Sequence, residues 1–264
     1  MADISAKDVQ ALRKATGVGM MDAKRALVEN DGDFDKAVVW LREKGLSKAA
    51  ERSDRANEQG AVTVVQDGAA AAIVELNCET DFVAKSEQFT NLLDEIASAV
   101  AGEGEPATTR FQDAIDDLRI TLKENIALGR VNRFEAPAGS VIGTYLHVQS
   151  GRGVNAVMVE LQGGDVTLAK EICQHIAFTK PPYLSRDDVP AERVAEERQV
   201  QEAITRNEGK PEAAVPKIVE GRLNGFFKDQ ALLEQDYVRD TKMSVRQALG
   251  DATITRFAQA AIGA

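Results

Sequence analysis

The residues best suited to chemistry lie in one short run, Cys78-Glu79-Thr80-Asp81-Phe82-Val83. A thiol and two carboxylates stand close together there, and a bulky aromatic ring follows them. Cysteine and acids could bind a metal, but such a site needs a further histidine or thiol nearby, and the run supplies neither. Cys78 could be a nucleophile beside His147 or His175, the two histidines of the chain. More simply, Cys78 is a small buried residue at the end of a strand.

Other familiar catalytic or ligand-binding patterns do not occur in the sequence. The phosphate-binding loop GxxxxGK[ST], the GxSxG nucleophile turn and the HExxH zinc helix are all absent. Gly17-Val18-Gly19 is too short for a dinucleotide-binding turn. We therefore expect no catalytic set, no bound metal and no cofactor, and a protein that acts by contact with a partner.

Phe82 could make such a contact. Residues 69–76 are small and apolar, as in a buried strand, and the apolar residues after Lys85 recur at helical spacing. Thr80–Val83 is therefore expected on the connecting loop, where a scaffold can present side chains outward. Phe82 would project as a wedge with the carboxylate of Asp81 beside it, able to disturb a cation or phosphate in a crevice of the partner. The alternative is that Asp81 caps the next helix and Phe82 folds back onto its first turn.

Composition argues against several classes of function. The formal net charge of −10 repels phosphate backbones, so we expect no direct nucleic-acid partner. No apolar run could cross a bilayer and the start of the chain lacks a secretory pattern, so we expect no membrane contact. Cys78 and Cys173 belong to no CxxC pair, which favours reduced thiols and a cytoplasmic protein.

The order of the predicted elements indicates an α+β fold. Residues 1–55 are expected to form a three-helix bundle, in which Ser5 caps the first helix and the third ends near Gly45. Met20 and Met21 open the second helix. Adjacent residues cannot both bury against one narrow stripe, so we expect at least one exposed methionine that suits docking. The alternative is that both pack into the small core.

The remaining sequence contains an internal repeat. A hairpin, a helix and a late strand occur twice in the same order, and Ile73-Val74-Glu75-Leu76 is similar to Met158-Val159-Glu160-Leu161. We infer two related subdomains, each with a small antiparallel sheet packed against helices: residues 56–139, and residues 140–181 with 228–264. Chance similarity between apolar strands is the alternative.

Residues 182–227 interrupt the second subdomain. Two helical stretches are predicted there, one lined by Val194, Val200 and Ile204, and a short turn between them favours an antiparallel helical hairpin. Such an arm could pack on its own body or on a second copy of the chain.

Two segments resemble the bacterial elongation factor Ts family. One is Leu12-Arg13-Lys14-Ala15-Thr16-Gly17-Val18-Gly19-Met20-Met21-Asp22-Ala23-Lys24-Arg25-Ala26-Leu27, and the other is Glu75-Leu76-Asn77-Cys78-Glu79-Thr80-Asp81-Phe82-Val83-Ala84-Lys85. The resemblance extends to His175-Ile176-Ala177, Lys180-Pro181 and Val219-Glu220-Gly221-Arg222, so it spans nearly the whole chain.

This resemblance implies a guanine nucleotide exchange factor that acts on the GTPase elongation factor Tu. It implies that residues 1–55 are a ubiquitin-associated-type domain, in which Arg13, Met20 and Met21 match positions that touch the nucleotide-binding domain. Thr80, Asp81, Phe82 and Val83 match the segment that dislodges magnesium from the partner. His147 matches a histidine that reaches another domain of the GTPase, and the hairpin matches a dimerisation domain, which implies a homodimer or a 2:2 complex.

Two departures from the family accompany this resemblance. Glu79 occupies a position where many members carry glutamine, and contacts made by a carboxy-terminal helical module of some members are expected to be absent. Two other functions stay open at this point. One is an enzyme with Cys78 as nucleophile, and the other is a helical adaptor or chaperone-like protein without exchange activity.

Overall fold

The computed structural model describes residues 4–50 and 54–263, without the side chains of residues 46–50. It begins with three packed helices, α1 (Ala6–Thr16), α2 (Met20–Glu29) and α3 (Phe34–Ala50). Ser5 caps α1 as predicted: its hydroxyl accepts from the Asp8 amide while the Asp8 carboxylate accepts from the Ser5 amide. The small core consists of Val9, Leu12, Ala23, Ala26, Leu27, Ala37 and Leu41.

The expected end of the third helix at Gly45 is wrong, because α3 continues to Ala50. Gly45 is a close-contact glycine: a Cβ there would lie 2.8 Å from two side-chain carbons of Ile120. Glycine therefore serves at this point to bring α3 against α6 and does not end the helix. Residues 51–53, within the predicted end of the first unit, lie outside the described residues.

The first sheet has the strand order β1-β2-β3 and is antiparallel throughout. It contains β1 (Gln59–Asp67), β2 (Ala70–Cys78) and β3 (Ala127–Glu135). Between β2 and β3 the chain forms α4 (Asp81–Ala84), α5 (Glu87–Glu103), a 3-10 helix (Glu105–Phe111) and α6 (Gln112–Leu122). The apolar face of α5, with Phe89, Leu93 and Ile96, packs on the outer face of this sheet.

The second sheet repeats this arrangement with the order β4-β5-β8. It contains β4 (Ser140–Gln149), β5 (Arg152–Gln162) and β8 (Thr253–Ala261), and α7 (Val166–Thr179) covers its outer face. The short elements β6 (Asp236–Tyr237), β7 (Asp240–Ser244) and α10 (Val245–Leu249) precede β8. The predicted repeat extends to matching buried acids: Glu75 pairs with Arg130 at 3.8 Å and Glu160 pairs with Arg256 at 2.7 Å.

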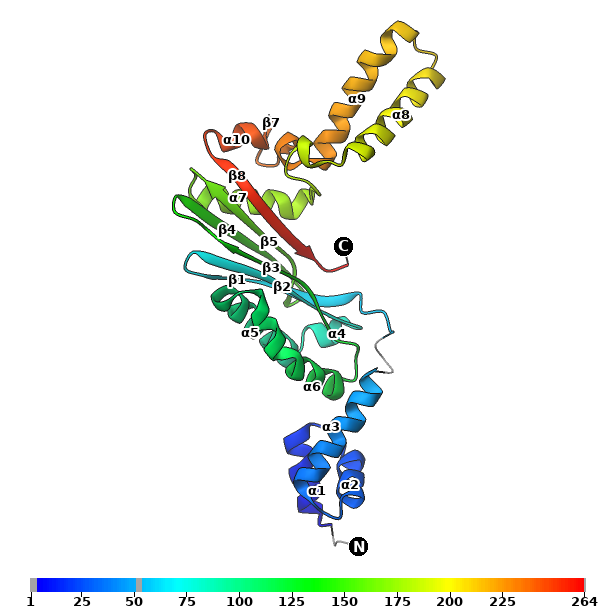
Figure 1. The fold of residues 1–264 in the computed structure, drawn as a ribbon, viewed down its shortest axis with the longest axis vertical. Helices are drawn as coiled ribbons and strands as arrows, with labels where there is room; N and C mark the ends of the chain where they lie inside the picture. The colour runs from blue at the N-terminus through cyan, green and yellow to red at the C-terminus, as the bar shows by residue number, and fades with distance from the viewer. Residues whose placement is uncertain (1–3, 51–53, 264) are drawn as a thin grey trace.

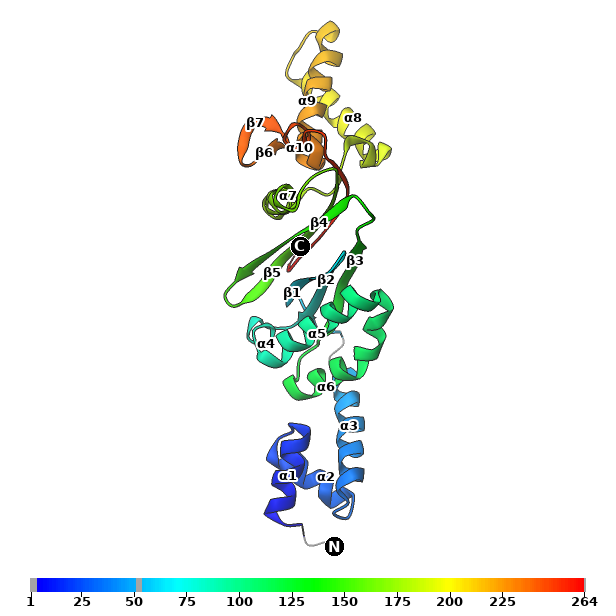
Figure 2. The ribbon, with the colours of Figure 1, turned by 90° about the vertical axis from the view of Figure 1, so that its left-hand side faces the viewer.

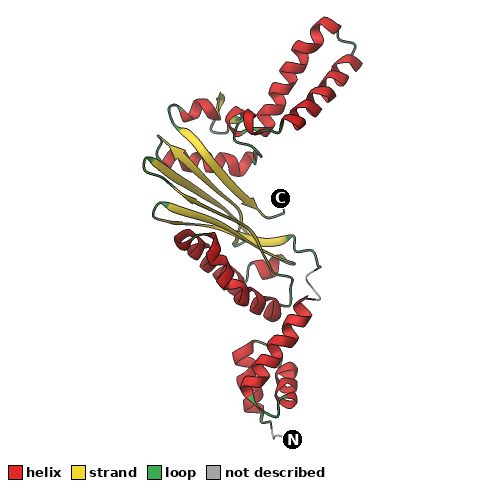
Figure 3. Ribbon diagram, in the orientation of Figure 1, coloured by secondary structure: helices red, strands yellow, loops and turns green. Residues whose placement is uncertain are grey.

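The two sheets face each other and form the centre of the molecule. Their shared core contains Val62, Ala71, Ile73, Phe134, Ile142, Ala156, Met158 and Ala260. Helices cover both outer faces, so the layers run helix, sheet, sheet, helix (Figures 1 and 3). The predicted α+β class is thus confirmed, and the stacking of the two subdomains through their bare sheet faces is new information from the structure.

The interrupting segment forms an arm whose far end lies away from the body (Figures 1 and 2). It consists of α8 (Ala191–Asn207), a 3-10 helix (Glu212–Ala214) and α9 (Val215–Gln230). Val200 and Ile204, two of the residues that line the first predicted stretch, are 51% and 40% exposed. A different face of α8 meets α9, with Thr205 fully buried. None of the helices in the described residues is long and apolar enough to cross a bilayer.

The close approach of the sheets can be tested at Gly153. A Cβ at this position would lie 2.1 Å from the carbonyl oxygen of Val62 on the facing sheet. We expect Gly153→Ala to lower the free energy of unfolding by about 1–3 kcal/mol, the usual cost of overpacking a core. Gly221→Ala is the control, because nothing lies within 4 Å of a Cβ there; on exposed α9 it should stabilise by about 0.5–1 kcal/mol. Urea unfolding measures both, and equal stability of the two variants would contradict the prediction.

Candidate partner-binding site

Thr80–Val83, expected as a loop, is a capped single helical turn. Thr80 is the N-cap of α4, and its hydroxyl accepts from the Val83 amide at 3.4 Å. Asp81 therefore lies inside the turn and is not its cap. It accepts a 2.5 Å hydrogen bond from the Lys85 ammonium, and this bond lowers the pKa of the Asp81 carboxyl, so the group stays charged at neutral pH.

Phe82 points away from the protein, with 82% of its surface exposed. The alternative that it folds back onto the following helix is therefore wrong. Its neighbours on α4 anchor the turn instead: Ala84 is fully buried in the core under α5, and Val83 packs against that core. The turn thus has a buried side that fixes it and an exposed side that presents the phenyl ring.

Hydrogen bonds from a distant segment hold the start of α4. The Glu124 carboxylate accepts from the backbone amides of Glu79 and Thr80, both at 3.1 Å, and from the Thr80 hydroxyl at 2.5 Å. In return, the Glu79 carboxylate accepts from the Asn125 amide at 2.7 Å. Sequence reasoning missed Glu124, because it lies 44 residues from Thr80 and belongs to no motif. The acid at Glu79, noted above as a departure from the family, has a structural partner.

His147 lies on β4 in the second sheet and is exposed. Its Nδ1 is 3.4 Å from the Tyr145 hydroxyl. With Arg152, Ala177 and Lys180 it lines a hollow of about 370 Å³. Although this hollow belongs to the second subdomain, the tip of the β4–β5 hairpin lies beside α4 (Figures 1 and 2), and the charge of Arg152 contributes to the lowered pKa of Asp81.

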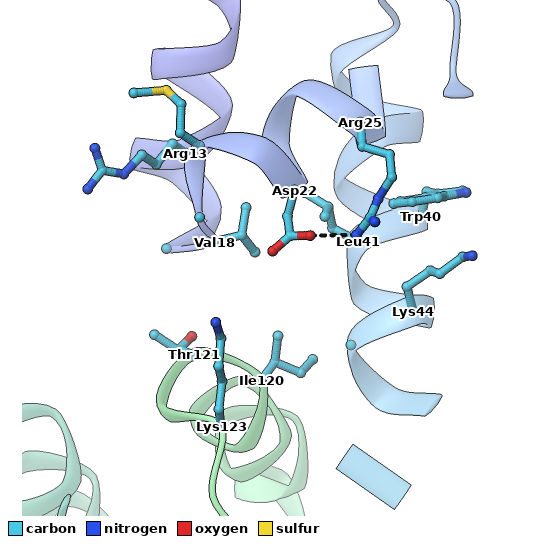
Figure 4. Close-up of a pocket in the computed structure, with 14 residues that line it drawn as sticks. Arg13, Val18, Asp22, Arg25, Trp40, Leu41, Lys44, Ile120, Thr121 and Lys123 are labelled. Atoms are coloured by element: carbon cyan, nitrogen blue, oxygen red, sulfur yellow. Dashed lines mark hydrogen bonds and ion pairs between the residues drawn. The ribbon is translucent and has the colours of Figure 1, made fainter. Parts of the chain in front are cut away.

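The remaining predicted contact residues are in the three-helix unit. Arg13 and Met20 line a cleft of about 590 Å³ between this unit and the C-terminal end of α6. Figure 4 shows that the cleft also holds Lys44, Lys123 and the Asp22–Arg25 ion pair. Met20 and Met21 are 49% and 76% exposed, so the alternative that both pack into the core is wrong. Met21 does not line the cleft and lies on the free surface of α2.

Comparison with known proteins identifies the family. The sequence profile described as "Elongation factor TS" matches residues 79–264. Elongation factor Ts of Clavibacter sepedonicus is 46% identical, and the alignment covers 100% of both chains. Elongation factor Ts of Streptomyces griseus is 45% identical with the same coverage, and that of Thermobifida fusca is 42% identical over 100% of this chain and 99% of the relative.

The chain belongs to the elongation factor Ts family. Membership associates it with translation and nucleotide exchange, and the resemblance of its two motifs to this family is confirmed. The profile match includes Thr80–Val83 but begins after α1, α2 and α3, whose kinship is carried by the full-length relatives.

In this elongation factor Ts family member, Cys78 has the surroundings of a structural residue. It is fully buried, and its thiol donates to the Thr80 carbonyl at 3.1 Å. Burial raises the pKa of the thiol to about 12, which disfavours the thiolate that a nucleophile needs. The described residues contain no group of three or more histidine, cysteine, aspartate or glutamate side chains that could hold a metal.

His175 is also a satisfied core residue. It is fully buried on α7; its Nε2 donates to the Gln235 side chain at 2.8 Å, and its Nδ1 accepts from the Val238 amide at 3.3 Å. Both ring nitrogens thus have hydrogen-bond partners when the imidazole is neutral. These bonds fasten α7 to the segment that follows the arm.

Acid should weaken the fold through His175. Burial lowers the pKa of His175 below its ordinary 6.5, so the unfolded chain binds a proton as pH falls through that value while the folded chain resists. The stability contributed by neutral His175 is therefore present above pH 6.5 and is lost below it. Urea unfolding at about pH 7.5 and about pH 5.5 should show a smaller loss for His175→Gln than for the unmodified chain. Exposed His147→Gln should behave like the unmodified chain; a loss unchanged by His175→Gln would contradict the assignment.

Glu124 should determine how firmly α4 is held. We expect Glu124→Ala to remove three hydrogen bonds, to cost about 1–2 kcal/mol of stability, and to speed amide hydrogen exchange in residues 79–85 most of all. Glu95→Ala, at an exposed position of α5, is the matched control and should leave that exchange unchanged. Equal amide hydrogen exchange in the two variants would mean that the hydrogen bonds of Glu124 do not hold α4.

Proposed function

We propose that this chain is the guanine nucleotide exchange factor of the GTPase elongation factor Tu, acting by binding alone in the cytoplasm. The observation that carries the proposal is Phe82, a ring that is 82% exposed on a turn held from both sides. An exposed phenyl group forgoes about 2 kcal/mol of burial. A rigid mount for such a ring suits insertion into another protein, because little side-chain and backbone freedom remains to be lost on binding.

The proposed target of the wedge is the magnesium site of the partner. GDP on such a GTPase is held by backbone amides, a lysine and a bridging Mg²⁺. In our proposal Phe82 enters between elements of the GTPase beside that site and shifts the side chains that bind magnesium. The charged Asp81 carboxylate attracts the cations of the site away from the phosphates. Thr80 and Val83 fix the turn from which both side chains project. Losing the cation leaves the phosphates under-compensated, so GDP departs.

The other predicted residues would hold the partner in place. Arg13, Met20 and Met21 dock on its nucleotide-binding domain, and His147 touches a second domain. Support comes from their exposure and from the cationic side chains that gather at the cleft beside Met20 in a chain of net charge −10. An acidic partner surface would meet these cations favourably.

Each of the four units of the chain has its own role in the proposed function. Residues 1–55 dock, residues 56–139 carry the wedge, and residues 140–181 with 228–264 reach the second domain. Residues 182–227 form the arm, where exposed Val200 and Ile204 support a homodimer or a 2:2 complex. The docking unit and the arm lie at opposite ends of an elongated molecule (Figures 1 and 2), so they can serve different contacts.

Exchange of this kind follows from differential binding. A factor that weakens GDP binding must itself bind less tightly when GDP is present. Driving a two-state equilibrium from 1:99 to 99:1 requires about 5.5 kcal/mol of differential affinity. No bond is made or broken in this mechanism, and the nucleotide-free GTPase is the state that the chain stabilises.

The wedge can be tested by Phe82→Ala with elongation factor Tu loaded with fluorescent GDP. We expect the stimulated release rate to fall about tenfold, the effect of losing about 1.4 kcal/mol of differential binding, at unchanged thermal stability. Stopped-flow fluorescence measures release, and circular dichroism checks the fold. Val166→Ala, an exposed apolar change on α7, should leave the rate unaltered.

Two outcomes would speak against the proposal. A folded Phe82→Ala variant with normal release would remove the wedge from the mechanism. If the unmodified chain bound the GTPase without accelerating release, it would be the adaptor considered above and not an exchange factor.

A further inference from the structure

Phe178 is an exposed aromatic residue to which the proposed function gives no role. It is 79% exposed at the end of α7. Among the described residues, the three most exposed large hydrophobic side chains are Phe82, Phe178 and Met21. The other two lie in the motifs that resemble the family. Phe178 lies outside both motifs, and sequence analysis did not single it out.

The helix end that carries Phe178 is firmly held. The side-chain amide of Asn155 donates to the Ala177 carbonyl at 2.9 Å, and Asn155 in turn accepts from Gln259 at 2.9 Å. Lys180 ends the helix in the left-handed region with φ 49°, and its amide donates to the Ile176 carbonyl at 2.8 Å. The ring is therefore exposed on a rigid support, as Phe82 is, and not on a loose terminus.

Cationic side chains lie near the helix end that carries Phe178. The preceding residue, Ala177, lines the hollow with His147, Arg152 and Lys180. Glu58 is the acidic residue lining this hollow, against the two cations Arg152 and Lys180. In a chain of net charge −10 this local excess of positive charge favours an acidic surface opposite.

This surface continues from the α4 side of the molecule. The Arg152 guanidinium donates to the Gly60 carbonyl at 2.6 Å and to the Gln59 side chain at 2.8 Å, at the start of β1. Gln59 pairs with Cys78, which lies two residues before Thr80. Arg152 thus stands between the wedge and the hollow, and one large partner could cover both.

The two rings lie in different layers of the molecule. Phe82 belongs to the helical layer on the first sheet and Phe178 to the helical layer on the second. Three layer spacings of about 10 Å separate these layers, or about 30 Å in all, which is comparable to the diameter of a small domain. Phe178 belongs to the second subdomain, which in the proposed function reaches a second domain of the GTPase.

We propose that Phe178 is a second apolar anchor for the same GTPase, filling an apolar pocket with a carboxylate rim on a domain other than the nucleotide-binding one. The inference rests on the proposed function and adds a residue and a pocket chemistry to it. Phe82 acts on the nucleotide site, whereas Phe178 contributes affinity that does not depend on the nucleotide.

The test compares Phe178→Ala with Val166→Ala, an exposed change at the other end of the same helix. Calorimetric titration of nucleotide-free elongation factor Tu should show about tenfold weaker binding for Phe178→Ala, about 1.4 kcal/mol, and unchanged binding for Val166→Ala. At saturating concentration, the maximal GDP release rate of Phe178→Ala should equal that of the unmodified chain. Thermal unfolding should show no difference, because the ring is exposed.

Binding of Phe178→Ala within about twofold of the unmodified chain, well below a hot-spot effect, would overturn the inference. Equal weakening by Val166→Ala would do the same. The failure of the proposed function looks different: the unmodified chain itself would then not accelerate GDP release. An active unmodified chain with normal affinity in Phe178→Ala removes the anchor alone.

Discussion

The close contact between the two three-stranded sheets is the constraint on which the rest of the structure depends. Small residues on the facing strands, Ala71, Ala156 and Ala260, let the backbones approach, and Gly153 has no room for any side chain. Arginines link the sheets at two places: Arg152 bonds the start of β1, and Arg256 donates to the Glu135 carbonyl at the end of β3 at 3.2 Å. A bulkier interface would move α4 away from the β4–β5 hairpin tip and disperse the candidate contact surface.

Within this arrangement, one side of α4 is anchored in the core and the other side is exposed to solvent. Buried Cys78 and Ala84 fix the two ends of the turn. Glu124 accepts hydrogen bonds from backbone amides that a strand-to-helix junction would otherwise leave unpaired. The same arrangement leaves a phenyl ring and a charged carboxylate facing water. A surface that exposes an apolar ring on so rigid a mount gains nothing for its own stability, which is why a partner is the natural explanation.

Local patterns in the sequence were sufficient for most of the helices and strands. The Ser5 cap, the repeat and the two sheets follow from spacing and turn residues. The errors came where a residue has two uses. A glycine such as Gly45 can end a helix or allow another helix to pack closely against it. Only the position of Ile120 shows that Gly45 allows close packing. The helical spacing of Val200 and Ile204 left open what they pack on, and only the packing of α8 against α9 shows that both are exposed.

By itself, the sequence determined the α+β class, the family and the run from Thr80 to Val83, because these depend on residues close together along the chain. Only the tertiary structure decided that Phe82 faces outward, that Glu124 holds its turn, and that His147 and Ala177, the residue before Phe178, line one hollow. Exposure and long-range hydrogen bonds depend on which distant segments meet, and the face-to-face sheets, more than any local preference, determine those meetings.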